Sequence, residues 1–354
     1  MDENATHWAG IDVAKKTFDG AVVFCGQHFP HTPLREVPAG SFERSREGAR
    51  LFVDWLHEQV NAHGQPAMGV RVVMESTGAY SLELTQWLLE CRATLSPAII
   101  NPQRTANFLK SLGLRNKTDR LEARALAFYG AERRPAPHEP LAPALAQLRD
   151  LNRYRDFLVA ERVAVKNRED DASGTKLVCQ MSKRRASQLD RDIKAIEKQM
   201  RSLISETDDL KRKHALLASI PGVGFLSVCT ILAELGNLRR FERSRQLSAF
   251  VGVNPRLYLS GTSVHGQSHM SKSGSSRVRQ ALYMSALAAI RMAGPQQAVY
   301  DRLIASGKKP MVALGAVMRK LLVLMRAMLI TETPYNKDYQ AGLKPVDKLA
   351  FNGG

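Results

Sequence analysis

The first third of the chain alternates short apolar runs with amphipathic stretches. Four runs have the length and composition of buried strands: residues 8–13, 18–24, 70–75 and 95–100. Between and after these runs, apolar residues at helical spacing or residues typical of a helix start predict helices at 42–60, 81–90, 101–112 and 119–129. The polar pair Lys15-Lys16 joins the first two runs, which indicates a β-hairpin. The pattern as a whole predicts an α/β sheet covered by helices.

The remainder of the chain has a helical pattern. Apolar residues repeat at intervals of three and four in a coiled-coil-like seam: Leu189, Ile193, Ile196, Met200 and Leu203. An earlier helix carries Leu145, Leu148, Leu151, Leu158 and Val165, and the polar stretch 169–174 between them indicates a bend. Glycine and serine punctuate the region that follows. We therefore expect four segments: an α/β domain over 1–135, a helical linker over 136–215, a mostly helical domain over 216–335, and a tail over 336–354.

The charge balance points to a polyanionic partner. Lys and Arg number 51 against 34 Asp and Glu, a formal net charge of +17, and this excess favours nucleic acid. No apolar stretch is long enough to span a membrane. The four cysteines lie far apart, which argues against zinc and against a disulfide framework, and the N-terminus lacks the layout of a signal peptide. These features predict a protein of the reducing cytoplasm with no membrane association.

Four acids lie where they could hold metal. Asp12 and Glu75 stand at or near the ends of two predicted strands, and Asp119 and Glu122 are three apart on one helix face. Each acid alone is uninformative, but their order is the layout of ribonuclease-H-like nucleases. Clustered carboxylates suit Mg²⁺ or Mn²⁺, and two such ions can stabilise the attacking and leaving oxygens of a phosphodiester.

Basic and glycine-rich stretches provide candidate nucleic-acid contacts. Residues 220–224 fit the turn of a helix–hairpin–helix, in which Gly222 and Gly224 would let the backbone approach a phosphate. Further candidates lie around the third acid: Arg104, Lys110, Arg115, Lys117 and Arg120. Others lie in the serine-rich region 260–284: Lys272, Arg277 and Arg279. Several serines lie in this region, and spacing alone does not select one as a nucleophile.

Motifs in the N-terminal half resemble the DEDD transposases of the insertion sequence 110 family, to which the pilin-gene invertases also belong. These motifs are Gly10-Ile11-Asp12-Val13-Ala14-Lys15, Met74-Glu75-Ser76-Thr77-Gly78-Ala79-Tyr80, Asn101-Pro102 and Asn116-Lys117-Thr118-Asp119. The resemblance implies a RuvC-like domain of ribonuclease H fold that binds Mg²⁺ or Mn²⁺ through its acids. The family's fourth acid is Asp, whereas this chain has Glu122.

The C-terminal half resembles the transposase domain of the same family. Its motifs are Phe250-Val251-Gly252-Val253-Asn254-Pro255, Ser260-Gly261 and Ser271-Lys272-Ser273-Gly274 followed by Arg279. The resemblance implies that Ser260 is the nucleophile and forms a covalent phosphoserine link to DNA.

The resemblance further implies several partners: donor and target double-stranded DNA, a structured bridge RNA, and other copies of the chain in a homodimer or homotetramer. It places the protein in the bacterial cytoplasm, associated with the nucleoid. Three alternatives stay open: a metal-only RuvC-like nuclease or junction resolvase, a non-catalytic nucleic-acid-binding protein, and a site-specific DNA invertase.

Overall fold

The chain forms two compact units, Met1–Pro140 and Leu141–Gly354. The computed structural model describes residues 7–24, 33–63, 69–112, 118–171, 175–260 and 264–336. Each unit has its own hydrophobic core. None of the helices in this described part is both long and apolar enough to cross a bilayer.

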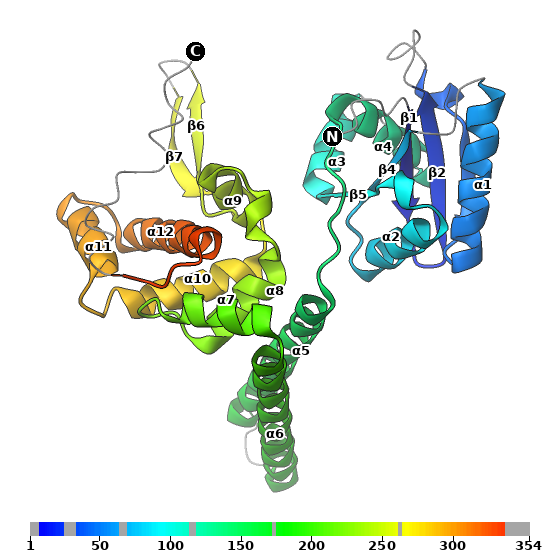
Figure 1. Ribbon diagram of the computed structural model, residues 1–354. Helices are drawn as coiled ribbons and strands as arrows, with labels where there is room; N and C mark the ends of the chain where they lie inside the picture. Colours follow the sequence, from blue (N-terminus) through cyan, green and yellow to red (C-terminus); the bar gives the residue numbers. More distant parts are fainter. Residues whose placement is uncertain are drawn as a thin grey trace. The chain divides into compact units, whose positions relative to one another are not determined.

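A five-stranded mixed sheet forms the centre of the first unit, with the order β3-β2-β1-β4-β5 (Figure 1). Its strands are β1 (His7–Val13), β2 (Thr17–Phe24), β3 (Ala39–Glu43), β4 (Val70–Glu75) and β5 (Ala98–Ile100). The strands β1, β2 and β3 pair with one another antiparallel, whereas β4 lies parallel to β1 and β5 parallel to β4. This is the topology of the ribonuclease H fold, so the α/β expectation for this part of the chain is confirmed.

Helices cover both faces of this sheet. One face packs against α1 (Arg46–Ala62) and α2 (Ala79–Cys91), and the other packs against α4 (Asp119–Arg133). The short α3 (Pro102–Ser111) precedes α4, and the 3₁₀ turns η1 (Leu34–Glu36) and η2 (Ala93–Leu95) lie in connections. Strand alternation divides the side chains of β1, so that Ile11 joins the core under α1 and Trp8 joins the core under α4.

The strand β3 was not predicted. Phe42 has helical spacing relative to Phe52 and was assigned to the helix over 42–60, but it lies on β3, and the helix begins only at Arg46. The Ser45 side chain caps that helix by accepting a hydrogen bond from the Gly48 amide at 3.0 Å. The Phe42 and Phe52 rings nevertheless pack with centroids 5.3 Å apart. Both residues therefore belong to one apolar surface, and their spacing alone does not show that the chain turns between them.

Two long helices open the second unit. The helices α5 (Pro143–Asp171) and α6 (Lys176–Glu206) pack along each other (Figure 1). Leu158, Leu189 and Ile193 form a cluster between them, while Leu148 and Met200 belong to the main core of the unit. The predicted apolar seam of α6 is therefore covered largely by α5 of the same chain.

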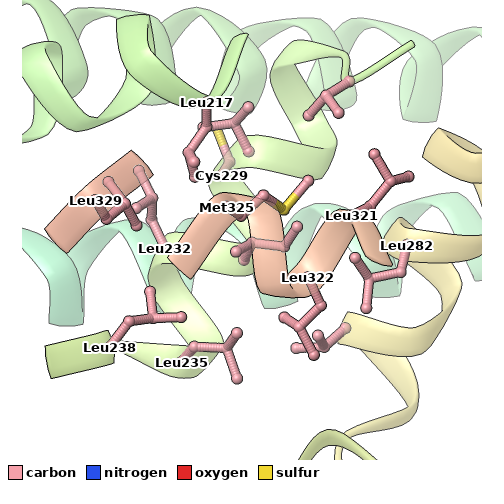
Figure 2. Close-up of a cluster of buried hydrophobic side chains, with 14 of the residues drawn as sticks. Leu217, Cys229, Leu232, Leu235, Leu238, Leu282, Leu321, Leu322, Met325 and Leu329 are labelled. Atoms are coloured by element: carbon pink, nitrogen blue, oxygen red, sulfur yellow. The ribbon is translucent and has the colours of Figure 1, made fainter. Parts of the chain in front are cut away.

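The rest of the second unit is mostly helical, as expected. Its elements are α7 (Asp208–Ala218), α8 (Phe225–Leu235), η3 (Leu238–Arg240), α9 (Ser244–Val251), β6 (Pro255–Ser260), β7 (Val264–Met270), α10 (Ser276–Ala289), α11 (Pro295–Ala305) and α12 (Pro310–Thr331). Figure 2 shows Leu321 and Met325 of α12 among Leu217, Leu232 and Leu282 in the core of this unit. The paired strands β6 and β7 form a hairpin that leaves the helical body next to α9 (Figure 1).

We expect Gly10→Ala to lower the free energy of unfolding of the first unit by about 3 kcal/mol or more. A Cβ atom at this position of β1 would lie 2.1 Å from the Ala123 carbonyl oxygen and 2.2 Å from the Ala127 amide nitrogen of α4, so the backbone would have to shift. Tryptophan fluorescence in a urea titration measures this change, because all three tryptophans (Trp8, Trp55, Trp87) belong to the first unit.

The matched control is Glu58→Ala on the exposed side of α1, which should shift the same transition by less than about 0.5 kcal/mol. Equal stability of the Gly10→Ala variant and the wild type would contradict the close approach of α4 to β1.

Candidate active site

Asp12 and Glu75 lie side by side on the face of the sheet that α4 covers. Parallel pairing sets Ile11 opposite Met74, so the next residue of each strand, Asp12 and Glu75, comes to the same edge of the sheet. Both side chains are partly exposed there. The structure thus brings together two of the acids predicted as metal ligands.

The other two acids stand in the first turns of α4. Thr118 caps this helix by accepting a hydrogen bond from the Leu121 amide at 3.3 Å, which fixes its start immediately before Asp119. Glu122 follows one turn later, and the helix then crosses β1 in close contact, at Gly10. Since Asp12 lies two residues after Gly10, on the same face, the acidic end of α4 comes to the acidic edge of the sheet.

The electrostatics confirm that these carboxylates are neighbours. The pKa of Asp12 is raised to about 6, first by burial and then by the negative charges of Glu122, Asp119 and Glu75. A carboxylate loses hydration on burial, and nearby like charges further disfavour its ionised form. A cation bound among these groups would remove this penalty.

The donor set fits a hard divalent cation, because it consists of carboxylate oxygens alone. Among the described residues, however, no group of three or more His, Cys, Asp or Glu side chains is arranged as a complete set of metal ligands. The structure thus places Glu75, Asp119 and Glu122 within electrostatic range of Asp12, without a closed coordination shell among the described residues.

A fifth acid, Asp19, joins this face and was missed in the sequence. Antiparallel pairing sets Asp19 of β2 directly opposite Asp12 of β1 and Ser41 of β3 directly opposite Asp19. The Ser41 hydroxyl donates a hydrogen bond to Asp19, and the Arg120 guanidinium of α4 lies 3.9 Å from the same carboxylate. The predicted hairpin around Lys15-Lys16 contained this signal, since its register pairs the two aspartates.

Glu75 has a positioning partner that was also not predicted. The hydroxyl of buried Thr105, in α3, lies 2.6 Å from Glu75 Oε2 and donates a hydrogen bond to it. Thr105 follows the Asn101-Pro102 helix start by one turn, so the chain that leaves β5 returns to orient an acid at the end of β4. Such a bond fixes the rotamer of the Glu75 carboxylate.

Three of the predicted nucleic-acid contacts of the first unit lie on α3 or α4. Arg104 and Lys110 are exposed on α3, while Arg120 pairs with Asp19 as described. Arg115 and Lys117 lie outside the described residues. The helix α4 therefore carries both the predicted cation Arg120 and two of the acids, and α3 carries Arg104 and Lys110 together with Thr105, which positions Glu75.

In the second unit, residues 220–224 connect α7 and α8, as a helix–hairpin–helix requires. Gly222 has a φ of +86°, and a Cβ there would lie 2.6 Å from the Ala289 amide nitrogen, so this position needs glycine. A Cβ at Gly224, by contrast, would meet no atom within 4 Å. Gly222 therefore shapes the turn, and Gly224 leaves open space at the start of α8.

The predicted nucleophile, Ser260, is the last residue of β6 and pairs with Val264 of β7; its side chain lies outside the described part. Lys272 is exposed in the loop after β7 and has a φ of +53°. Arg279 donates hydrogen bonds to the carbonyl oxygens of Gly274 (2.6 Å) and Val251 (3.2 Å). Arg279 therefore holds this loop against α9.

Arg277, also predicted as a nucleic-acid contact, lies 3.4 Å from the Asp156 carboxylate of α5 and is partly exposed. The Asp156 charge offsets that of the guanidinium, and exposed ion pairs of this kind are weak. Arg277 can therefore exchange this partner for a phosphate at little cost.

Two family models match separate parts of the chain. A model described as a transposase, for the DEDD transposases of IS110, matches residues 9–172. A second, described as Transposase IS116/IS110/IS902 family, matches residues 214–301. The first match includes all four predicted acids, and the second includes the hairpin at 220–224, Ser260 and the basic loop.

Related proteins agree with these matches. The chain is 28% identical over 331 residues to the pilin gene-inverting protein of Moraxella bovis, which covers 93% of this chain and 98% of that protein. It is 31% identical over 153 residues to a protein of the insertion element IS110 from Streptomyces coelicolor, covering 42% of this chain and 38% of that one. Among solved structures, Thermus thermophilus RuvC matches with 15% identity and a TM-score of 0.26, covering 37% of this chain and 99% of RuvC.

We expect Asp12→Asn to stabilise the metal-free first unit near neutral pH by about 1–3 kcal/mol, allowing for partial exposure of the side chain. The folded-state pKa of Asp12, about 6, lies above its ordinary value of 3.8, so folding favours the protonated acid. The wild type therefore loses stability relative to the variant as the pH rises from about 4 through about 6.

Urea titrations in the presence of a chelator, followed by tryptophan fluorescence at several pH values, measure this difference. Asp54→Asn on the exposed surface of α1 is the matched control and should show no such pH-dependent gain. A variant less stable than the wild type at neutral pH would contradict the crowding of carboxylates around Asp12.

Proposed function

Because the chain belongs to the IS110 family of DEDD transposases and is therefore a DNA recombinase, we propose that it cuts and rejoins DNA with a carboxylate metal site and a serine nucleophile. The observation that carries this proposal is the convergence of acids from β1, β4 and α4 around Asp12, whose pKa is raised by burial and then by the negative charges of these neighbours. Asp12, Glu75, Asp119 and Glu122 would hold Mg²⁺ or Mn²⁺. A bound divalent ion stabilises negative charge on phosphate oxygens.

Thr105 and Asp19 support this site from the protein side. Thr105 orients Glu75 by its 2.6 Å hydrogen bond. Asp19 and Ser41 hold Arg120 beside the acids, where its guanidinium can contact a phosphate of the bound strand. Glu122 stands where the family has Asp, and like Asp119 it lies in the first turn of α4.

Ser260 supplies the nucleophile in this proposal. Its oxygen attacks a DNA phosphorus atom, a new serine–phosphate ester bond forms, and the bond from phosphorus to the deoxyribose oxygen breaks. The hydroxyl proton ends on the leaving deoxyribose oxygen. A deoxyribose hydroxyl of another strand then attacks the phosphoserine and releases Ser260. Each step exchanges one phosphoester for another, so rejoining requires no ATP.

A second candidate within the same chemistry is site-specific inversion of a DNA segment. The match to the pilin gene-inverting protein runs over 93% of this chain and 98% of that protein. Inversion and transposition differ in how the paired sites are arranged and share the same cutting and joining steps. The arrangement of the DNA sites, rather than the residues of the active site, separates these two outcomes.

We further propose that donor and target double-stranded DNA are bound together with a structured bridge RNA by a homodimer or homotetramer. The net charge of +17 supports binding of polyanions. Exposed cations at both units, including Arg104, Lys110 and Lys272, would contact phosphates. Joining two duplexes needs several active sites, which supports an assembly of more than one chain.

We expect Ser260→Ala to abolish the covalent protein–DNA adduct and to lower strand joining on the order of 10³-fold, because no other group would replace the attacking oxygen. Radiolabelled DNA carrying a nick or junction, incubated with Mg²⁺ and separated on a denaturing gel, measures the adduct, and mass spectrometry identifies the attached residue. DNA affinity should stay within about twofold of the wild type.

The matched control is Ser276→Ala, an exposed serine at the start of α10, which should leave both activities intact. Unchanged cleavage by the Ser260→Ala variant would support a metal-only nuclease instead. Asp12→Asn should abolish cleavage while DNA binding is retained, which separates the recombinase from a non-catalytic DNA-binding protein.

We expect a defined RNA to accompany the protein when it is purified from cells that carry its element. Sequencing of the bound RNA measures this, with an unrelated basic protein purified in parallel as the control for non-specific binding. Enrichment of one structured species supports the guide. The same RNA profile for both proteins would remove the bridge RNA from the proposed function and leave the DNA chemistry intact.

A further inference from the structure

An exposed aromatic ring lies against an arginine in the second unit. Phe250, in α9, is 48% exposed. The Arg240 guanidinium lies 5.1 Å from the centroid of this ring and 4.9 Å from that of Phe241. The two rings are 5.2 Å apart and tilted by 55°. Phe241 itself is buried, so only Phe250 presents its ring to solvent.

The segment behind this ring is fixed to the body of the unit. Arg326 of α12 donates hydrogen bonds to the carbonyl oxygens of Phe241 (2.6 Å) and Glu242 (2.8 Å). On the other side, a Cβ at Gly274 would lie 1.9 Å from the Phe250 carbonyl oxygen, so the loop after β7 packs directly on the end of α9. Phe250 is therefore held on a rigid support, as a preorganised contact requires.

The helix that carries the exposed ring, and the loop packed on the end of that helix, are rich in cations. Residues 239–256 contain five arginines and one acid, Glu242. Arg243 and Arg245 at the start of α9 are exposed, and so is Lys272 in the loop packed on its other end. Lys272 is tied to this end by a hydrogen bond from its amide to the Gly252 carbonyl oxygen at 3.1 Å. A negatively charged partner is thus favoured next to the ring.

This combination differs from the other exposed aromatic residues in the described chain. Tyr154 and Phe157 of α5 stack on each other, with centroids 6.0 Å apart and an interplanar angle of 22°. Phe250 instead lies against the Arg240 guanidinium, in a segment with several exposed cations. An aromatic ring within a basic surface is the arrangement that binds unpaired nucleotides, since every base offers a π-face for stacking.

We propose that Phe250, backed by Arg240, is a stacking site for an unpaired base, and that Arg243, Arg245 and Lys272 contact the phosphates beside it. A fully paired duplex keeps its bases inside the helix, so the site selects opened, bulged or looped nucleotides. The base can belong to a DNA strand opened for exchange or to a loop of RNA. The proposal rests on the proposed function only in taking nucleic acid as the ligand.

The test uses the full chain and three fluorescent probes. One is a DNA duplex with a single unpaired 2-aminopurine, one is an RNA hairpin with the same base in a bulge, and one is the fully paired DNA duplex. Stacking on Phe250 should quench 2-aminopurine in at least one bulged probe. Phe250→Ala should remove this quenching and weaken binding of that probe about 10-fold, with the paired duplex bound as by the wild type.

Three variants serve as matched comparisons. Phe250→Trp keeps a π-face and should retain the quenching, which shows that ring stacking rather than folding is measured. Phe157→Ala removes an aromatic residue that is 59% exposed but lies on α5, and should change nothing. Arg245→Gln should weaken all probes alike and reduce the salt dependence of binding by about one phosphate contact.

The outcomes separate this inference from the proposed function. Quenching of the DNA probe alone, or of the RNA probe alone, supports the site and assigns the source of its base. Equal loss of affinity for paired and bulged probes in Phe250→Ala, or no quenching with the wild type, overturns the stacking site while nucleic-acid binding stands. If the wild type bound none of the three probes, the proposed function would fall as well.

Discussion

The close packing of α4 on β1 is the contact on which the acidic site of the first unit depends. Gly10 has no side chain, and this lets the α4 backbone approach at Ala123 and Ala127. The same helix starts at Asp119, so the distance between helix and strand decides how closely its acids approach Asp12. The core beneath α4 keeps Asp12 partly buried beside the other acids, and this burial, followed by the repulsion from their charges, raises the pKa of Asp12. The ionised Asp12 therefore lowers the free energy of unfolding of the first unit, and a cation bound among the acids would offset this loss.

The cationic side chains of the protein fall into two groups: some bond to other groups of the fold, and others are exposed to solvent. Arg326 and Arg279 donate to backbone carbonyl oxygens and fix loops, and Arg153 of α5 lies 2.8 Å from the Glu234 carboxylate of α8. Such arginines stabilise the fold, because buried carbonyl oxygens need donors. Exposed cations such as Lys110, Lys272 and Arg245 are accessible to an anionic partner. The net charge therefore indicates a polyanion, while the contacts of individual side chains show which surfaces can bind it.

The helical pair α5–α6 shows the limit of a periodic pattern. The interval of three and four residues along α6 predicts a long helix with one apolar seam, and both features are present. The pattern is the same whether the seam meets another chain or the preceding helix. Here Leu189 and Ile193 meet Leu158 of α5, because α5 and α6 pack along each other. Any contact between copies through this region would use other residues of the pair.

The sequence alone predicted most helices and strands of the first unit and the order of its acids, but not strand β3. Alternating apolar runs predicted an α/β sheet, the helix predicted over 119–129 placed Asp119 in its first turn, and the motifs resembled those of the family. Local spacing specifies these features, because strand and helix periods are properties of neighbouring residues. Only the tertiary structure decided that Asp19 joins the acidic face, that Thr105 orients Glu75, that Phe42 belongs to a strand, and that Arg279 fixes a loop. Each of these depends on a contact with a residue distant along the chain, and sheet register or helix packing sets that contact.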